Sequence, residues 1–110
     1  MAPTEARNLA AIITGSARGI GKAIAIKLAE DGYDIALNDL PSRLDELETV
    51  ATKIKEIGRK VLIAPADVTD EQAMDDLVSK TVTELGEVYI ASLIPIRTVG
   101  GHILIRKHRW

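Results

Sequence analysis

The chain has 110 residues, no cysteine and a formal net charge of −2. This length allows one domain with its own core, and the absence of cysteine excludes disulfides and thiol chemistry. No apolar run approaches the roughly 18 residues of a membrane span, and the N-terminal residues lack the pattern of a secretory signal. We therefore expect a cytoplasmic chain with no membrane partner.

The first predicted element is a strand over residues 9–13, which are all apolar. A strand that is apolar on both faces is typical of a parallel sheet buried on both sides. A glycine-rich segment and then a helix follow, and the helix is expected to end at Gly32. Its predicted apolar face consists of Ile20, Ala23, Ile24 and Leu28.

The segment between this strand and this helix holds Gly15, Gly19 and Gly21. A strand, a glycine loop and a helix in this order direct the unpaired N–H groups of the helix start at an anion, normally a diphosphate. A plain tight turn is the alternative, because turns use glycine freely. The flanking strand and helix favour the phosphate site.

The stretch Thr14-Gly15-Ser16-Ala17-Arg18-Gly19-Ile20-Gly21 resembles the Thr-Gly-x-x-x-Gly-Ile-Gly cofactor loop of the short-chain dehydrogenase/reductase family. This resemblance implies an α/β fold, a Rossmann-like parallel sheet with helices on both faces, and an NAD(P)-dependent oxidoreductase. It also implies a set of cofactor-binding residues on the loop, namely Gly15, Ser16, Arg18, Gly19, Ile20 and Gly21.

A second strand is predicted over residues 33–39, and it ends in an acid, Asp39. Asp39 lies 24 residues after Gly15, near the roughly 20 expected for a carboxylate that binds the adenosine ribose. The alternative is an aspartate that only opens the next turn. A carboxylate here repels the 2′-phosphate of NADP, whereas the family resemblance associates Arg18 with NADP. We expect NAD.

Two more helices and a third strand follow along the chain. The pattern predicts a helix that starts near Ser42 and closes at Gly58, a strand over residues 60–64, and a helix that is opened by Thr69–Gln72. Strand and helix thus alternate three times, which indicates βαβ units on a parallel sheet. The resemblance implies the strand order 3-2-1, which is the adenine-binding half of the fold.

Asp67 and Val68 follow the third strand. By the resemblance, this pair lies against the adenine ring, and the acid accepts from the exocyclic amine. The alternative is a helix entry with no part in binding.

The chain is predicted to divide after Glu87 into the N-terminal half of a dinucleotide-binding domain, 1–87, and a divergent basic tail, 88–110. The first part has 10 Lys and Arg against 16 Asp and Glu, a net charge of −6, whereas the tail has four basic residues and no acid. The resemblance covers about residues 9–87, and it points to the diacetyl or acetoin reductase and 3-oxoacyl-carrier-protein reductase branch.

Two outcomes are open for the tail. Residues 88–94 can pair beside the first strand as a substitute fourth strand, with a turn at Gly100 and Gly101 and a return strand over 103–105, or the first strand is left as an exposed apolar edge. The basic end is expected to be a solvated terminus with no nucleic-acid partner. His102 and His108 lack neighbouring ligands, so we expect no metal site.

The catalytic Ser and Tyr-x-x-x-Lys of the family are not found in this chain. Tyr33 is followed four residues later by Leu37, and Tyr89 by Leu93. We therefore predict a truncated, weakly NAD(P)-binding fragment with no catalytic residue, and no oligomer through the family's usual interface. The alternatives are a non-catalytic interaction or regulatory fragment, or a non-functional splice or frameshift product.

Overall fold

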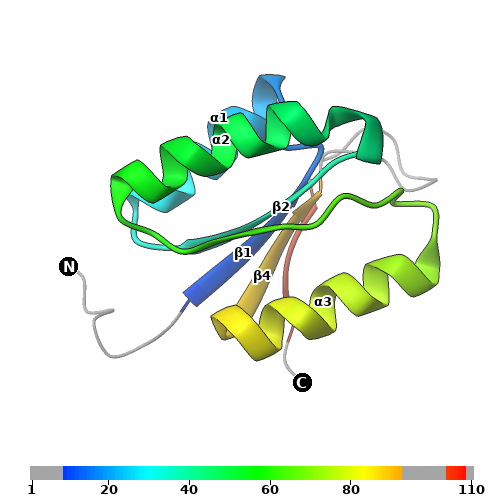
Figure 1. Cartoon of the computed structure of the whole chain (residues 1–110). Helices are drawn as coiled ribbons and strands as arrows, with labels where there is room; N and C mark the ends of the chain where they lie inside the picture. The colour runs from blue at the N-terminus through cyan, green and yellow to red at the C-terminus, as the bar shows by residue number, and fades with distance from the viewer. Residues whose placement is uncertain (1–8, 93–103, 109–110) are drawn as a thin grey trace.

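A computed structural model describes residues 9–92 and 104–108, which form one five-stranded sheet in the order β3-β2-β1-β4-β5 with helices on both faces (Figure 1). The elements are β1 (Leu9–Thr14), α1 (Gly19–Glu30), β2 (Asp34–Asn38), the 3₁₀ turn η2 (Pro41–Arg43), α2 (Leu44–Ile57), β3 (Val61–Ile63), α3 (Glu71–Leu85), β4 (Glu87–Ser92) and β5 (Leu104–His108). The predicted strand order 3-2-1 and the Rossmann-like α/β architecture are confirmed.

The sheet is parallel from β3 to β4, and β5 runs antiparallel to β4 at its edge. The strand β4 pairs along β1 from Leu9↔Glu87 to Ile13↔Ala91, so of the two outcomes left open for this segment, pairing beside β1 is the one observed, over Glu87–Ser92. The alternative of an exposed edge at β1 is therefore wrong. Gly100 and Gly101, which were expected to form the turn before the return strand, lie outside the described residues.

Two apolar clusters fill the space between the sheet and its helices. Helices α1 and α2 cover one face of the sheet and α3 covers the other (Figure 1). Because neighbouring residues of a strand point to opposite faces, Ile13 belongs to the cluster with α1 and α2, whereas Ile12 belongs to the cluster with α3. The first cluster also includes Ile35, Leu37, Leu47, Val50 and Ile54, and the second includes Ala36, Leu77, Leu85 and Val88.

The buried face of α1 differs from the predicted one. Gly21, Ala25 and Ala29 are its buried residues, whereas Ile20 is 68% exposed. Ala23 is exposed as well, so half of the predicted face was wrong. At Gly21 the start of the helix lies directly against the glycine loop, where a side chain has no room, and Ala25 and Ala29 belong to the core cluster that α1 shares with α2.

The three helices begin in different ways. Helix α3 opens within the predicted capping stretch Thr69–Gln72, where Asp70 is the cap, with its Oδ1 accepting from the backbone N–H of Ala73 at 3.1 Å. The sequence predicts that α2 starts near Ser42. In the structure a 3₁₀ turn opened by Pro41 comes first, the α-helix begins at Leu44, and no side chain caps it. Pro41 suits this position because its φ is already fixed near the helical value.

An ion pair joins β2 to β3 at the end of the sheet opposite the glycine loop. The Asp34 Oδ1 atom accepts from Arg59 Nε at 3.1 Å and Nη2 at 2.9 Å, and from the backbone N–H of Lys60 at 3.0 Å. Asp34 is buried, whereas the Arg59 side chain is 36% exposed. The three bonds fix the entry of β3, a strand of only three residues.

Candidate functional site

The glycine loop connects β1 to α1 at the carboxyl end of the parallel strands. Gly15 and Gly19 have φ values of 67° and 62°, a region in which other residues are strained. A Cβ on Gly21 would lie 2.8 Å from the carbonyl carbon of Gly15 and 3.1 Å from the Cα of Ser16. The first turn of α1 therefore rests on the loop backbone, and only glycine permits this approach.

The N-terminus of α1 has no capping side chain among the described residues, and its first turn holds no acid. Its N-cap is Arg18, which has an extended backbone and an exposed side chain. In α3, by contrast, Asp70 occupies the equivalent position and accepts from the first turn. The N–H groups at the start of α1 thus remain available to an anion. Ile20 stands beside them with its side chain exposed.

Ser16 ties the glycine loop to β2. Its backbone N–H donates to the carbonyl oxygen of Asn38 at 3.0 Å. Its hydroxyl donates to the same oxygen at 3.2 Å and accepts from the Asn38 N–H at 3.1 Å. Because Ser16 is fully buried, its side chain holds the loop in place and does not face solvent. Its predicted contact with a cofactor stays a prediction.

Asp39 lies directly beside the glycine loop, although 22 residues separate it from Ala17. Its Oδ2 accepts from the N–H of Ala17 at 3.1 Å, and its Oδ1 accepts from the N–H of Leu40 at 2.8 Å. Arg43 Nε lies 3.9 Å from Oδ1, and the Asp39 side chain is 11% exposed. The carboxylate therefore stabilises the turn, as one interpretation expected. It also stands where the ribose interpretation requires it, and that role stays a prediction.

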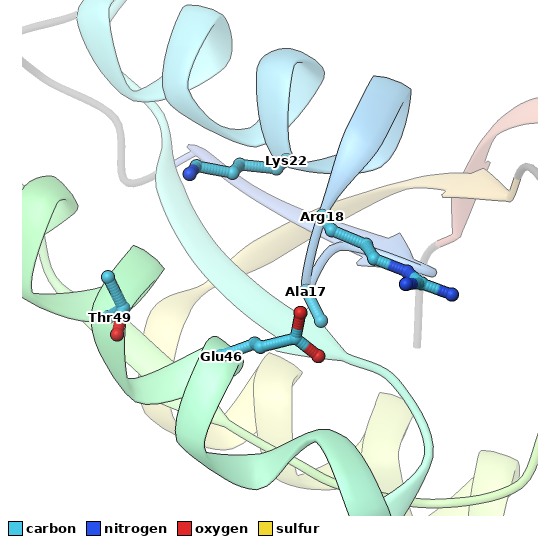
Figure 2. A pocket seen from close by; sticks show the side chains of 5 residues that line it. All are labelled: Ala17, Arg18, Lys22, Glu46 and Thr49. Atoms are coloured by element: carbon cyan, nitrogen blue, oxygen red, sulfur yellow. The ribbon is translucent and has the colours of Figure 1, made fainter.

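A pocket of about 160 Å³ opens between α1 and α2. Figure 2 shows Lys22 on one side of it and Glu46 and Thr49 on the other, while the Arg18 side chain extends away from α2. Arg43 Nη1 pairs with Glu46 Oε1 at 3.1 Å, which links the pocket to the turn at Asp39.

Sequence reasoning missed four lining residues of this pocket, namely Ala17, Lys22, Glu46 and Thr49. Helical spacing carried a signal for the last two, which are three residues apart. Glu46 and Thr49 must share one side of α2, whereas Arg18 precedes α1 with an extended backbone, so its spacing from Lys22 does not place the two side chains together. That this side of α2 faces α1 depends on how the two helices pack, which spacing alone does not reveal.

Asp67 and Val68 lie after β3, at the same edge of the sheet as the glycine loop. Asp67 is exposed, and its Oδ1 accepts from the backbone N–H of Thr69 at 2.9 Å and from its hydroxyl at 2.8 Å. These bonds belong to the entry of α3, which was the alternative interpretation. The Thr69 backbone bond, followed by the hydroxyl bond, lowers the pKa of Asp67. Contact of this pair with adenine stays a prediction.

The lowered pKa of Asp67 predicts an acid-sensitive turn at 67–69. Because the folded pKa lies below 3.8, the ordinary value for an aspartate, the turn is fully stabilised above that pH and loses this support as the pH falls through the folded value. We expect the Thr69 amide signal in NMR spectra to titrate below pH 3.8. A Thr69 signal that titrates above that value would contradict the prediction.

Within the described residues, no cluster of three or more His, Asp or Glu side chains is arranged to hold a metal ion. Across the same part of the chain, none of the helices has the length and apolar character needed to cross a membrane.

Comparison with known proteins places this geometry in one family. The family model described as short chain dehydrogenase matches residues 9–94, so the match runs through β4 and beyond Glu87. A short-chain dehydrogenase/reductase of Hericium erinaceus is 45% identical over 80 residues, which are 71% of this chain and 32% of that protein. A 3-oxoacyl-[acyl-carrier-protein] reductase of Aggregatibacter actinomycetemcomitans is 40% identical over 78 residues, 71% of this chain and 32% of the relative.

Among solved structures, a carveol dehydrogenase from Mycobacterium avium in complex with NAD superposes with a TM-score of 0.73 at 29% identity. That alignment covers 86% of this chain and 38% of the dehydrogenase. The chain thus spans about a third of the length of the relatives that it matches. By its glycine loop, its strand order and these matches, the chain belongs to the short-chain dehydrogenase family.

Proposed function

We propose that this chain binds a nicotinamide dinucleotide through its adenosine diphosphate half, as part of an oxidoreductase of the short-chain dehydrogenase type. One observation carries the proposal: the uncapped start of α1 is held against the glycine loop, beside the carboxylate of Asp39. The diphosphate is received by Gly15, Gly19, Ile20 and Gly21, and the ribose by Asp39. The NAD complex of the M. avium relative supports this assignment.

We further propose that NAD is preferred to NADP. The Asp39 carboxylate lies against the loop and would face the ribose hydroxyls, so it disfavours a 2′-phosphate. Arg18 and Lys22, which both line the pocket beside it, act in the opposite direction. Asp39 prevails in this proposal because two backbone N–H groups hold it in place, whereas the exposed Arg18 side chain is not held.

The expected affinity is low. A charge-assisted bond from Asp39 contributes about 1.5–3 kcal/mol and the helix start about 1–2 kcal/mol, which together compare with the roughly 4 kcal/mol of a millimolar dissociation constant. Titration with AMP and NAD, followed by NMR, tests the proposal. Backbone amide signals from Gly15 to Gly21 should shift and saturate at millimolar ligand. If those signals do not move, nucleotide binding at this loop is wrong.

Replacing Asp39 with alanine should weaken AMP binding about tenfold, because the ribose loses a charged acceptor. The same substitution should narrow the difference in affinity between NAD and NADP. Both effects can be measured by NMR titration, and Asp75→Ala is a matched control because Asp75 is an exposed residue of α3. Unchanged AMP affinity in the Asp39 variant would mean that the carboxylate serves only the turn.

We also propose that this chain, taken alone, does not transfer hydride. General acid catalysis needs a proton donor with a suitable pKa within reach of the substrate, and neither Tyr33 nor Tyr89 is followed four residues later by a lysine. In this proposal the chain is a nucleotide-binding fragment of an oxidoreductase of the short-chain dehydrogenase type. Oxidation of NADH in the presence of a ketone by the purified chain would contradict this.

A further inference from the structure

Asn38 connects three segments at the carboxyl edge of the sheet. It is the last residue of β2 and is fully buried. Its backbone N–H and carbonyl oxygen bond with Ser16 in the glycine loop. Its side-chain Nδ2 donates to the carbonyl oxygens of Ala64 at 2.9 Å and Ala66 at 3.2 Å. One residue therefore fixes the glycine loop and the segment after β3 relative to each other.

The segment 64–66 depends on these side-chain bonds because β3 ends early, at Ile63. Two backbone bonds also hold it, from the N–H of Ala64 to the oxygen of Leu37 at 2.9 Å and from the N–H of Ala66 to the oxygen of Asp39 at 3.0 Å. The Asn38 amide supplies two more. The hydrogen bonds that hold segment 64–66 thus rise from two to four, and this segment leads directly into residues 67–68.

The Oδ1 atom of Asn38 is buried and has no hydrogen-bond partner. Leaving a buried acceptor unpaired costs stability, and the two carbonyl partners require the NH₂ group to point toward them. The fold thus accepts an unpaired oxygen at this position in order to keep both donors on 64–66. An apolar side chain of similar size would fill the space without leaving an unpaired oxygen. We therefore take the two Nδ2 bonds to Ala64 and Ala66 as the reason for an asparagine here.

We infer that Asn38 is a positioning residue for the base of the bound nucleotide, an inference that rests on the proposed function. The sheet order puts the glycine loop after β1, Asp39 after β2 and segment 64–68 after β3, in one row along the same edge. A nucleotide with its phosphate on the loop and its ribose at Asp39 extends its base over 64–68. Asn38 fixes the distance between the glycine loop, which takes the phosphate, and segment 64–68, which takes the base.

The test compares two ligands in the whole chain, AMP and inorganic pyrophosphate. Asn38→Asp keeps the size of the side chain but donates at most one bond, and only when the carboxyl is protonated. We expect it to weaken AMP binding about tenfold while pyrophosphate binding changes by less than about twofold. Thr81→Ala is the control, because it removes a buried hydroxyl that bonds within α3, away from the site. It should leave both affinities unchanged.

Equal losses for AMP and pyrophosphate, or no loss for either, would overturn the inference while the proposed function stands. If the unaltered chain binds neither ligand, the proposed function itself fails. Should Asn38→Asp not fold, the side-chain NH₂ signals of Asn38 in the unaltered chain give a second measurement. They should shift with AMP and stay in place with pyrophosphate, and the absence of a shift with AMP would also overturn the inference.

Discussion

Replacing Gly21 with alanine is expected to destabilise the chain by about 1–3 kcal/mol, the range found when a packed site is overfilled. The new Cβ would lie 2.8 Å from the carbonyl carbon of Gly15 and 3.1 Å from the Cα of Ser16. These are backbone atoms, which cannot turn aside as a long side chain does. The first turn of α1 must therefore move away from the loop, and the N–H groups proposed to receive the phosphate move with it.

The same substitution should lower AMP affinity by more than about tenfold. Thermal or urea unfolding gives the stability, and NMR titration below the unfolding transition gives the affinity. Ala23→Ser is the control, since it adds one heavy atom at an exposed position of the same helix. If Gly21→Ala binds AMP as the unaltered chain does, the close approach of helix and loop is not needed for binding.

Replacing Asp34 with alanine should destabilise the chain by about 2–3 kcal/mol, near the lower end of the range for a broken buried pair. The loss stays near that lower end because the Arg59 side chain is 36% exposed and regains water when its partner is lost. The N–H of Lys60 also loses its acceptor. Since the ion pair fixes the entry of β3, the loss should appear first as faster hydrogen exchange in 61–63.

A matched control for this substitution is Asp76→Ala. Asp76 is exposed on α3, where it accepts from Gln72 at 2.9 Å, and an exposed substitution of this kind changes stability by less than about 0.5 kcal/mol. Urea unfolding of both variants distinguishes the stability contributed by the Asp34–Arg59 pair from the general effect of removing an acid. Similar midpoints for the two variants would show that the Asp34–Arg59 pair contributes little.

Most of the fold could be predicted because its signals are local. The strand β1 is apolar from Leu9 to Ile13 and lies in the centre of the sheet, and the predicted capping stretch 69–72 does open α3, with Asp70 as the cap. The face of α1 could not be predicted in the same way. Spacing favoured the larger apolar residues, such as Ile20, yet Ile20 is exposed, Gly21 lies against the glycine loop and Ala25 is buried in the core. That preference belongs to tertiary packing, which periodicity does not encode.

The candidate site was predictable to a similar degree. The spacing of the loop glycines and the 24 residues from Gly15 to Asp39 predicted both parts of the site. The structure brings Asp39 and the loop together through the N–H of Ala17. The part played by Asn38 had no such signal. An asparagine at the end of a strand is ordinary, and its importance arises only because β3 is short and segment 64–66 crosses beside it.

The uncapped start of α1 has a thermodynamic consequence. No side chain among the described residues caps this helix end, so its backbone donors are available to an anion from outside the chain. A ligand that binds only the folded chain would therefore raise the free energy of unfolding. A nucleotide present at a hundred times its dissociation constant would add about 2.7 kcal/mol to the free energy of unfolding. For a chain of 110 residues, such a gain makes the concentration of the ligand a determinant of how much folded protein exists.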